Sequence, residues 1–340
     1  MYTIQLPVES MEQQIALFGT HDDHVRIIER ALAVGINARN SVIVISGESE
    51  VAVEEAGRVL DSLKQVYAKK EPINADMVHR MVELVQSGRV KAGLDAMDDV
   101  VVITHSGKPI KCKTIGQKNL VKALQDTSVT VCIGPAGTGK TFLAVAEAVA
   151  EFKRGEIERI IMSRPAIEAG EERLGFLPGD LAQKVDPYLR PLYDALNDIL
   201  GSEQAKRMQE KGIIEIAPLA YMRGRTLSNA RIIIDESQNA SLQTLKMALT
   251  RLGEGSKMVL TGDVTQIDLP KATTSGLEKV ASILKTVEDV SIVRLNNQDV
   301  VRNKIVRDII KAFEKEESRQ REKDVQLAKR KKFNADVPRK

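Results

Sequence analysis

Along the first third of the chain, short stretches with helical periodicity alternate with short apolar runs typical of strands. This pattern predicts a small unit that contains both helices and strands. The run SVIVIS indicates a strand, because its apolar, β-branched residues end at a glycine. The turn signal SGKP at 106–109 would fold the apolar run before it back as a hairpin. The predicted elements are helices at 22–34, 50–68 and 76–86 and strands at 41–46 and 100–104. We therefore expect residues 1–110 to form a small α/β module.

Six apolar runs follow within residues 111–313, separated by longer stretches of helical periodicity. The runs lie at 129–133, 160–163, 213–217, 232–234, 257–261 and 291–295. Several are apolar without alternation, as strands buried on both faces of a parallel sheet should be. Strands that alternate with helices predict an α/β domain in which helices cover both faces of a parallel sheet.

Composition narrows the class of protein. Hydrophobic residues make up 43% and charged residues 29%, as in ordinary globular domains. Aromatic residues make up only 3%, which argues against a nucleic-acid reader built on base stacking. Two cysteines, Cys112 and Cys132, are too few for a disulfide framework. No signal peptide and no apolar run of about 18 residues is present, so we expect a cytoplasmic protein without a membrane segment.

The net charge of +3 is unevenly distributed. Residues 314–340 contain ten Lys or Arg and six Asp or Glu, so this charged tail carries the basic excess and the rest of the chain is near neutral. A basic tail suits an acidic surface such as RNA. A solvated end, disordered or continued as an extended helix, is the alternative.

The segment TVCIGPAGTGKTFLAVAEAVAEF has the order strand, glycine-rich loop, helix. Its glycines let the backbone N–H groups turn inward toward phosphates, and the following helix directs its positive end at the same anion. Lys140 would reach the β- and γ-phosphates, and Thr141 would offer its hydroxyl to Mg²⁺. The predicted ATP-binding residues are Gly134, Pro135, Ala136, Gly137, Thr138, Gly139, Lys140 and Thr141.

The segment RIIIDESQN supplies the acidic partner that such a loop requires. Asp235 follows a buried apolar strand, at the end where sites in open α/β sheets lie, and should hold Mg²⁺ with Thr141. Glu236 could polarise the attacking water as general base, which favours hydrolysis over kinase chemistry. An exposed strand end or a helix cap is the alternative for the pair.

The segment KMVLTGDVTQIDLP is another apolar strand that ends in polar residues. If its strand adjoins the first two, Thr261, Asp263 and Gln266 come near the γ-phosphate. Gln266 could then sense hydrolysis, because a loop that contacts the γ-phosphate is a natural switch. A turn satisfied by its own Asp and Thr side chains is the alternative.

Two more side chains complete the candidate set. Arg302 begins the helical run VVRNKIVRDIIKAF and could reach the γ-phosphate as an arginine finger, in its own subunit or a neighbour. Gln117 precedes the glycine loop, and its amide suits an adenine edge. The alternatives are a solvent-facing helix arginine and a surface glutamine.

Taken together, the motifs over residues 110–313 resemble the PhoH family of ATPases, whose core is similar to the RecA-like first motor domain of superfamily 1 helicases. The resemblance rests on GPAGTGKT, SRPAIEAGEERLGFLPGDL, PYLRPLYDAL, DESQN and TGDVTQIDLP. It implies an adenine-reading role for Gln117 in IGQ and γ-phosphate contacts for Gln266 and for Arg302 in LNNQDVVR. Arg164 in SRP falls where helicases often touch the nucleic-acid backbone. An ion-pairing arginine after a strand is the equal alternative.

The resemblance also implies a setting for the ATPase. Residues 1–110 are similar to the KH-like module of many members, although they contain no GxxG loop, so that docking of a protein is the alternative to RNA binding. RNA and an rRNA-processing endoribonuclease are the implied partners, and a homo-oligomeric ring, a hexamer, is the implied assembly. The second motor domain of a full helicase is not recognisable in the sequence. We therefore do not expect a single subunit to unwind a duplex.

Two functions follow. The leading hypothesis is an RNA-associated, Mg²⁺-dependent ATPase. Helicase-like activity is the most specific version of this hypothesis. The alternative is a slow nucleotide-switched interaction protein, in which the γ-phosphate orders loops that dock a partner nuclease. A phosphotransferase would use the same loop, but no substrate-pocket motif supports it.

Overall fold

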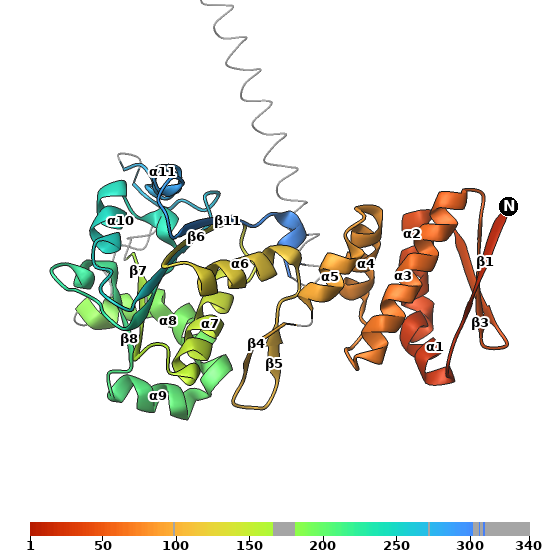
Figure 1. Cartoon of the computed structure of the whole chain (residues 1–340), viewed down its shortest axis with the longest axis horizontal. Coiled ribbons are helices and arrows are strands. Elements are labelled where there is room, and N and C mark those ends of the chain that lie inside the picture. Colours follow the sequence, from red (N-terminus) through yellow and green to blue (C-terminus); the bar gives the residue numbers. More distant parts are fainter. Residues whose placement is uncertain (98, 166–180, 271–272, 302–305, 307–308, 310–340) are drawn as a thin grey trace, which may run out of the picture. The chain divides into compact units, whose positions relative to one another are not determined.

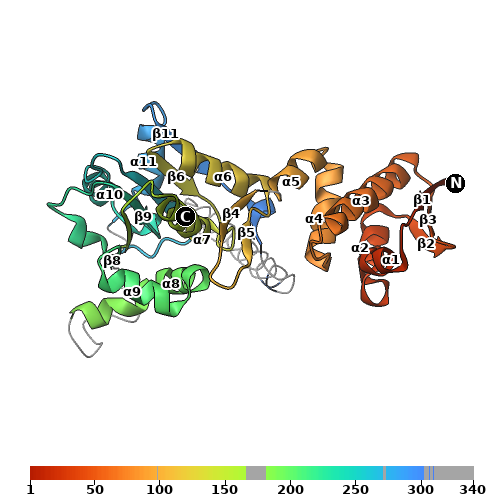
Figure 2. The same cartoon turned by 60° about the horizontal axis from the view of Figure 1, so that its bottom comes forward.

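The computed structural model describes residues 1–97, 99–165, 181–270, 273–301, 306 and 309. The described part of the chain divides into two compact units, one with Met1–Glu83 and the other with Leu84–Val301. Figures 1 and 2 show the elements of both units.

The smaller unit is a three-stranded antiparallel sheet in the order β1-β3-β2, packed against helices. Its elements are β1 (Tyr2–Pro7), α1 (Met11–Phe18), α2 (Asp23–Leu32), β2 (Gly35–Arg39), β3 (Val42–Gly47) and α3 (Glu50–Ala68), followed by α4 (Ala75–Gln86). Ser10 and Ser49 cap α1 and α3 by accepting hydrogen bonds from backbone N–H groups. Ile43 and Ile45 of β3 are fully buried, so the core lies between the sheet and the helices.

The predicted helices and strands of this unit are found within two residues of their expected bounds. Helix α2 ends at Leu32 because Ala33 takes a left-handed φ of 54°. Strands β1 and β2 and helix α1 were not predicted. A tight turn joins β2 to β3 with positive φ at Asn40 and Ser41, which lack the usual glycine of a two-residue hairpin. The α/β character is confirmed, and the likeness to a KH module stays a prediction.

The larger unit is built on a six-stranded sheet in the order β11-β6-β10-β9-β7-β8. Every pairing in it is parallel. The strands are β6 (Val129–Ile133), β7 (Arg159–Arg164), β8 (Ile214–Pro218), β9 (Ala230–Ile234), β10 (Lys257–Gly262) and β11 (Val290–Arg294). The register pairs Ile133 with Gly262 and Leu260 with Ile234, so the carboxyl ends of β6, β10 and β9 meet at one edge.

Helices cover both faces of this sheet. They are α6 (Ile115–Asp126), α7 (Lys140–Arg154), α8 (Leu181–Leu200), α9 (Ser202–Glu210), α10 (Leu242–Leu249) and α11 (Leu277–Leu284). Helix α5 (Val90–Ala96) packs against α6. Helices α6 to α9 share one apolar core with residues such as Ile233 and Val259. Helices α10 and α11 share the other core with Ile232 and Leu260 (Figure 2). All six predicted strands are present, and the predicted parallel α/β fold is confirmed.

The hairpin of β4 (Val100–Ile103) and β5 (Pro109–Lys111) belongs to the larger unit. Val101 and Val102 enter the core beneath α6 to α9, and β4 packs against α7. The division after Glu83 groups the hairpin with its packing partners, and the predicted domain bounds at residue 110 stay a prediction. Within the part of the chain that is described, no helix is both long and apolar enough to cross a bilayer.

Candidate nucleotide site

The glycine-rich loop connects β6 to α7, at the sheet edge where the strands end. Gly137 and Gly139 have φ of 83° and 80°, values that side chains with a Cβ rarely adopt. A Cβ on Gly134 would lie 2.7 Å from the Cβ of Leu295. Gly139 precedes α7 without a side-chain cap, so the first N–H groups of the helix stay available to an anion.

Lys140 lies across its own loop. Its Nζ donates to the carbonyl oxygens of Gly134 at 2.7 Å and Pro135 at 3.0 Å. The Thr138 hydroxyl donates to the same Pro135 oxygen at 2.9 Å. These hydrogen bonds hold the Lys140 ammonium group against the glycine loop, in the wall of the pocket that a phosphate would enter.

Thr141 and Asp235 lie side by side, as the sequence predicts. The Asp235 Oδ1 accepts hydrogen bonds from the hydroxyls of Thr141 at 2.6 Å and Thr261 at 2.7 Å. Hydroxyl and carboxylate oxygens are the hard ligands that Mg²⁺ prefers, and Mg²⁺ at nucleotide sites takes only one or two from the protein. Among the described residues no group of three or more His, Cys, Asp or Glu could hold a metal ion.

Glu236 follows Asp235 with a left-handed φ of 50°. Its Oε1 pairs with Nη2 of Arg164 at 2.7 Å, and its Oε2 accepts a hydrogen bond from Nε2 of Gln238. Arg164 also donates from Nη1 to the carbonyl oxygen of Tyr188 at 2.9 Å. Both carboxylate oxygens of the expected general base therefore have side-chain partners, which the sequence did not indicate.

Gln238 joins the DESQN segment to the loop after β10. It is fully buried, its Oε1 accepts from the Asp263 N–H at 3.0 Å, and its Nε2 donates to the Gln266 carbonyl oxygen at 2.9 Å. Asp263 in turn accepts from the N–H of Ala136 in the glycine loop at 2.8 Å. The only sequence signal for Gln238 was its place inside the DESQN motif. The structure thus connects phosphate loop, acidic pair and sensor loop through hydrogen bonds.

These segments line one pocket of about 270 Å³. Its walls are formed by Ala136, Gly137, Gly139, Lys140, Thr141, Phe142, Asp235, Glu236, Gly262, Asp263 and Gln266. The predicted phosphate-binding, metal-binding, base and sensor residues therefore converge on a single cavity, although three separate segments of the sequence supply them.

Gln117 lies behind the glycine loop. It is 4% exposed, its Nε2 donates to the Thr138 carbonyl oxygen at 3.0 Å, and its Oε1 accepts from the Lys113 N–H at 2.7 Å. The surface-glutamine alternative is therefore wrong, and the adenine contact stays a prediction. Arg302 lies outside the described residues. Val301, just before it, donates from its N–H to the Gly137 carbonyl oxygen at 2.9 Å.

Comparison with known proteins places the chain in a family. The profile described as "PhoH: PhoH-like protein" matches residues 109–314. This chain belongs to the PhoH family. It is 45% identical over 309 residues to a PhoH-like protein of Bacillus subtilis (strain 168), covering 91% of this chain and 96% of that one. It is 36% identical over 303 residues to Protein PhoH of Escherichia coli (strain K12), covering 87% and 82%. The predicted PhoH resemblance is confirmed.

Solved structures resemble the PhoH chain only weakly. A Sulfolobus solfataricus SWI2/SNF2 ATPase core in complex with dsDNA aligns with a TM-score of 0.31 and 15% identity, covering 53% of this chain and 43% of that one. Pif1 helicase from Candida albicans gives a TM-score of 0.27 and 17% identity, covering 53% and 39%. The family, the parallel sheet and the loop geometry make this chain an ATPase-type P-loop protein.

Proposed function

We propose that this PhoH family member binds ATP with Mg²⁺ and hydrolyses it in the service of RNA metabolism. The observation that carries the proposal is the convergence of Lys140, Thr141, Asp235, Glu236 and Gln266 on one pocket. A glycine loop with a lysine, a hydroxyl beside a carboxylate, and a second carboxylate nearby are the parts that phosphoryl transfer to water requires.

Each residue has a role in this proposal. The loop N–H groups and Lys140 hold the phosphates, and Thr141 and Asp235 hold Mg²⁺. Mg²⁺ bound there would neutralise charge on the β- and γ-phosphate oxygens. Glu236 accepts the proton of the attacking water, and Gln266 orients that water or contacts the γ-phosphate. Gln117 reads adenine, and Arg302 contacts the γ-phosphate.

The RNA link rests on the family resemblance and on the basic excess in residues 314–340. We extend the proposal to an rRNA-processing endoribonuclease as partner, a homo-hexameric ring as assembly and the cytoplasm as location. In such a ring, ATP hydrolysis would drive helicase-like movement on RNA.

Phosphate release from Mg²⁺–ATP, with and without single-stranded RNA at two salt concentrations, tests the proposal. We expect release that RNA stimulates and that salt weakens, because contacts to a phosphate backbone release counterions. Lys140→Ala should lose turnover by about 10²- to 10³-fold while keeping its melting temperature. If Lys140→Ala retained its turnover, residues 134–141 would not be the ATP-binding loop of the hydrolytic site.

A second candidate is a slow nucleotide switch that docks a nuclease, and the engagement of both Glu236 oxygens favours it. In that case release is slow and indifferent to RNA. Hydrogen exchange of residues 263–270 should then differ between ADP and a non-hydrolysable ATP analogue, since Gln238 ties this loop to Glu236. Identical exchange in the two nucleotides would exclude the switch.

A further inference from the structure

A positive charge from the protein already lies at the acidic pair. Arg164 ends β7, and its Nε lies 3.8 Å from Asp235 Oδ2 while its Nη2 pairs with Glu236 at 2.7 Å. One guanidinium group therefore neutralises both carboxylates on which the proposed Mg²⁺ site and water activation depend. Arginine cannot lose its proton in a protein, so this charge is permanent.

Arg164 approaches the pair from a second cavity, not from the nucleotide pocket. This cavity of about 200 Å³ is lined by Arg164, Pro165, Tyr188, Glu236, Asn239, Gln266 and Asp268. Glu236 and Gln266 line both cavities, whereas Arg164 lines only the second. Glu236 and Gln266 thus border both the nucleotide pocket and the second cavity.

We propose that Arg164 is an internal counter-cation that Mg²⁺ must displace, so that it sets the magnesium concentration the nucleotide site requires. The inference rests on the proposed function and concerns the regulation of the same site. A divalent ion next to Asp235 repels a guanidinium group at this distance, because the Coulomb interaction of two cations in a partly buried site is only weakly screened. Arg164 then retreats into its own cavity, where Asp268 offers a carboxylate in the wall.

The displacement has a consequence for catalysis. When Arg164 leaves, the Oε1 of Glu236 loses its charged partner and becomes available to the attacking water. Mg²⁺ binding and exposure of the base become one event. Water is thereby not activated before the metal and the phosphates are in place.

The test is the Mg²⁺ dependence of ADP binding, measured by calorimetry on the full chain, which requires no turnover. For Arg164→Gln we expect the Mg²⁺ concentration at half-saturation to fall about tenfold, since a neighbouring positive charge is removed. Arg164→Lys keeps the charge and should stay within about twofold of wild type. Arg159→Gln is the matched control, because Arg159 begins the same strand and donates to the Ser228 carbonyl oxygen instead.

A second variant tests the proposal in the opposite direction and does not depend on the folding of Arg164→Gln. Asp268→Asn removes the carboxylate that receives Arg164, so the magnesium requirement should rise about threefold. An Arg164→Gln protein that melts like wild type and needs the same or more Mg²⁺ overturns the inference, as does an unchanged requirement in Asp268→Asn. Wild-type protein that binds no ADP at any Mg²⁺ concentration overturns the proposed function itself.

Discussion

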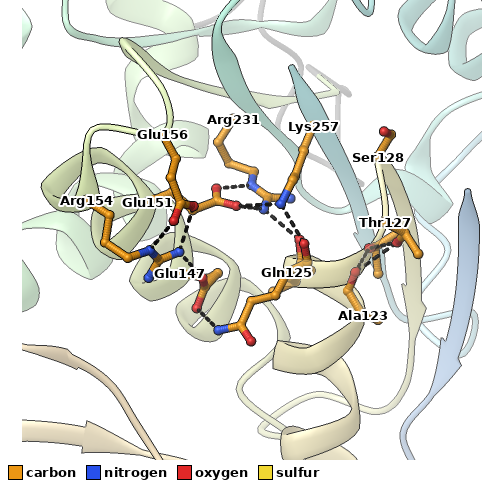
Figure 3. A network of polar contacts seen from close by, with 12 residues as sticks. Ala123, Gln125, Thr127, Ser128, Glu147, Glu151, Arg154, Glu156, Arg231 and Lys257 are labelled. Carbon is orange, nitrogen blue, oxygen red and sulfur yellow. Dashed lines mark hydrogen bonds and ion pairs between the residues drawn. The ribbon is translucent and has the colours of Figure 1, made fainter. Parts of the chain in front are cut away.

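Helix α7 has a polar cluster at each end. One cluster lies at the nucleotide pocket, and the other is a buried ion pair. At its first turn, Thr141 meets Asp235 beside the nucleotide pocket. Near its last turn, Glu151 meets Arg231 (Figure 3). Thr141 and Glu151 lie about 15 Å apart along the helix, given its rise of about 1.5 Å per residue. In both clusters the partner comes from β9 or directly follows it.

The pair of Glu151 and Arg231 at the end of α7, here called the closed pair, is almost fully buried. Arg231 contacts both carboxylate oxygens of Glu151, and its Nη2 also donates to the Leu124 carbonyl oxygen at 2.8 Å. Lys257 adds a contact to Glu151 at 3.3 Å. Arg231 and Glu151 are 0% and 1% exposed, and Figure 3 shows the charged groups converging between α7 and the strands.

The comparison distinguishes a structural ion pair from a pair of charged groups that can bind a ligand. Where an acid and an arginine are both almost fully buried, as Glu151 and Arg231 are, the pair joins helix to strand and is closed to solvent. Where the same groups border cavities, as Glu236 and Arg164 do, their contacts can be exchanged for a metal or a phosphate. The closed pair keeps β9 and α7 in the register that brings Thr141 to Asp235.

The largest effect is expected when the closed pair is broken on one side. Arg231→Met leaves Glu151 buried, and although Lys257 remains near it, the free energy of unfolding should fall by about 3–5 kcal/mol. Denaturant unfolding followed by circular dichroism measures it. Arg294→Met is the control, because the Arg294–Glu278 pair is exposed and should contribute less than about 1 kcal/mol. Equal losses in both variants would contradict the distinction.

Removing both partners should recover most of this loss. In Glu151→Leu combined with Arg231→Met no unpaired carboxylate stays buried, and such apolar replacements of buried pairs are often neutral. We expect stability within about 2 kcal/mol of wild type by the same unfolding measurement. A double variant as unstable as Arg231→Met would mean that the charges themselves, not their pairing, hold α7 to β9.

At the open end, loss of one hydroxyl should affect the metal and not the fold. Thr141→Val removes a proposed Mg²⁺ ligand, so half-maximal phosphate release should need about tenfold more Mg²⁺. The melting temperature should stay close to wild type. Thr250→Val, which removes a hydroxyl bonded to the Met247 carbonyl at the end of α10, is the control. An equal shift in both variants would argue against the assignment.

The smallest effect concerns Glu147, one turn before Glu151. Burial raises the pKa of this carboxyl above its usual range, although the Arg154 guanidinium opposes the shift. A raised pKa in the folded state means that the stability this group contributes is present below about pH 4.5 and is lost as pH rises through the shifted value. Glu147→Gln should therefore gain stability relative to wild type between pH 4 and pH 7, measured by unfolding at about these two values. No pH dependence of the difference would contradict the shift.

Much of the candidate site was predictable because its signals are local. The glycine loop is contiguous, and Asp235 and Gln266 each follow an apolar run that ends abruptly. The parallel sheet then brings these ends together. Arg164 as the partner of Glu236 was not predictable, because that pairing depends on β7 lying beside β9. Gln238 reads as an ordinary polar residue until its two amide atoms are seen to bond different segments.

Sequence alone determined the alternation of strands and helices, the phosphate loop and the family, since each depends on residue types within short stretches. Only the tertiary structure decided which charges are structural and which are available. Arg231 precedes three isoleucines at the start of a strand, and Arg164 stands between Ser163 and Pro165 at the end of one, but these neighbours do not show how deeply each charge is buried. One lies at the start of a central strand beneath α7, and the other lies at the end of β7 in the wall of the second cavity. Burial and free space around a charge are properties of the packed fold, and these decide its chemistry.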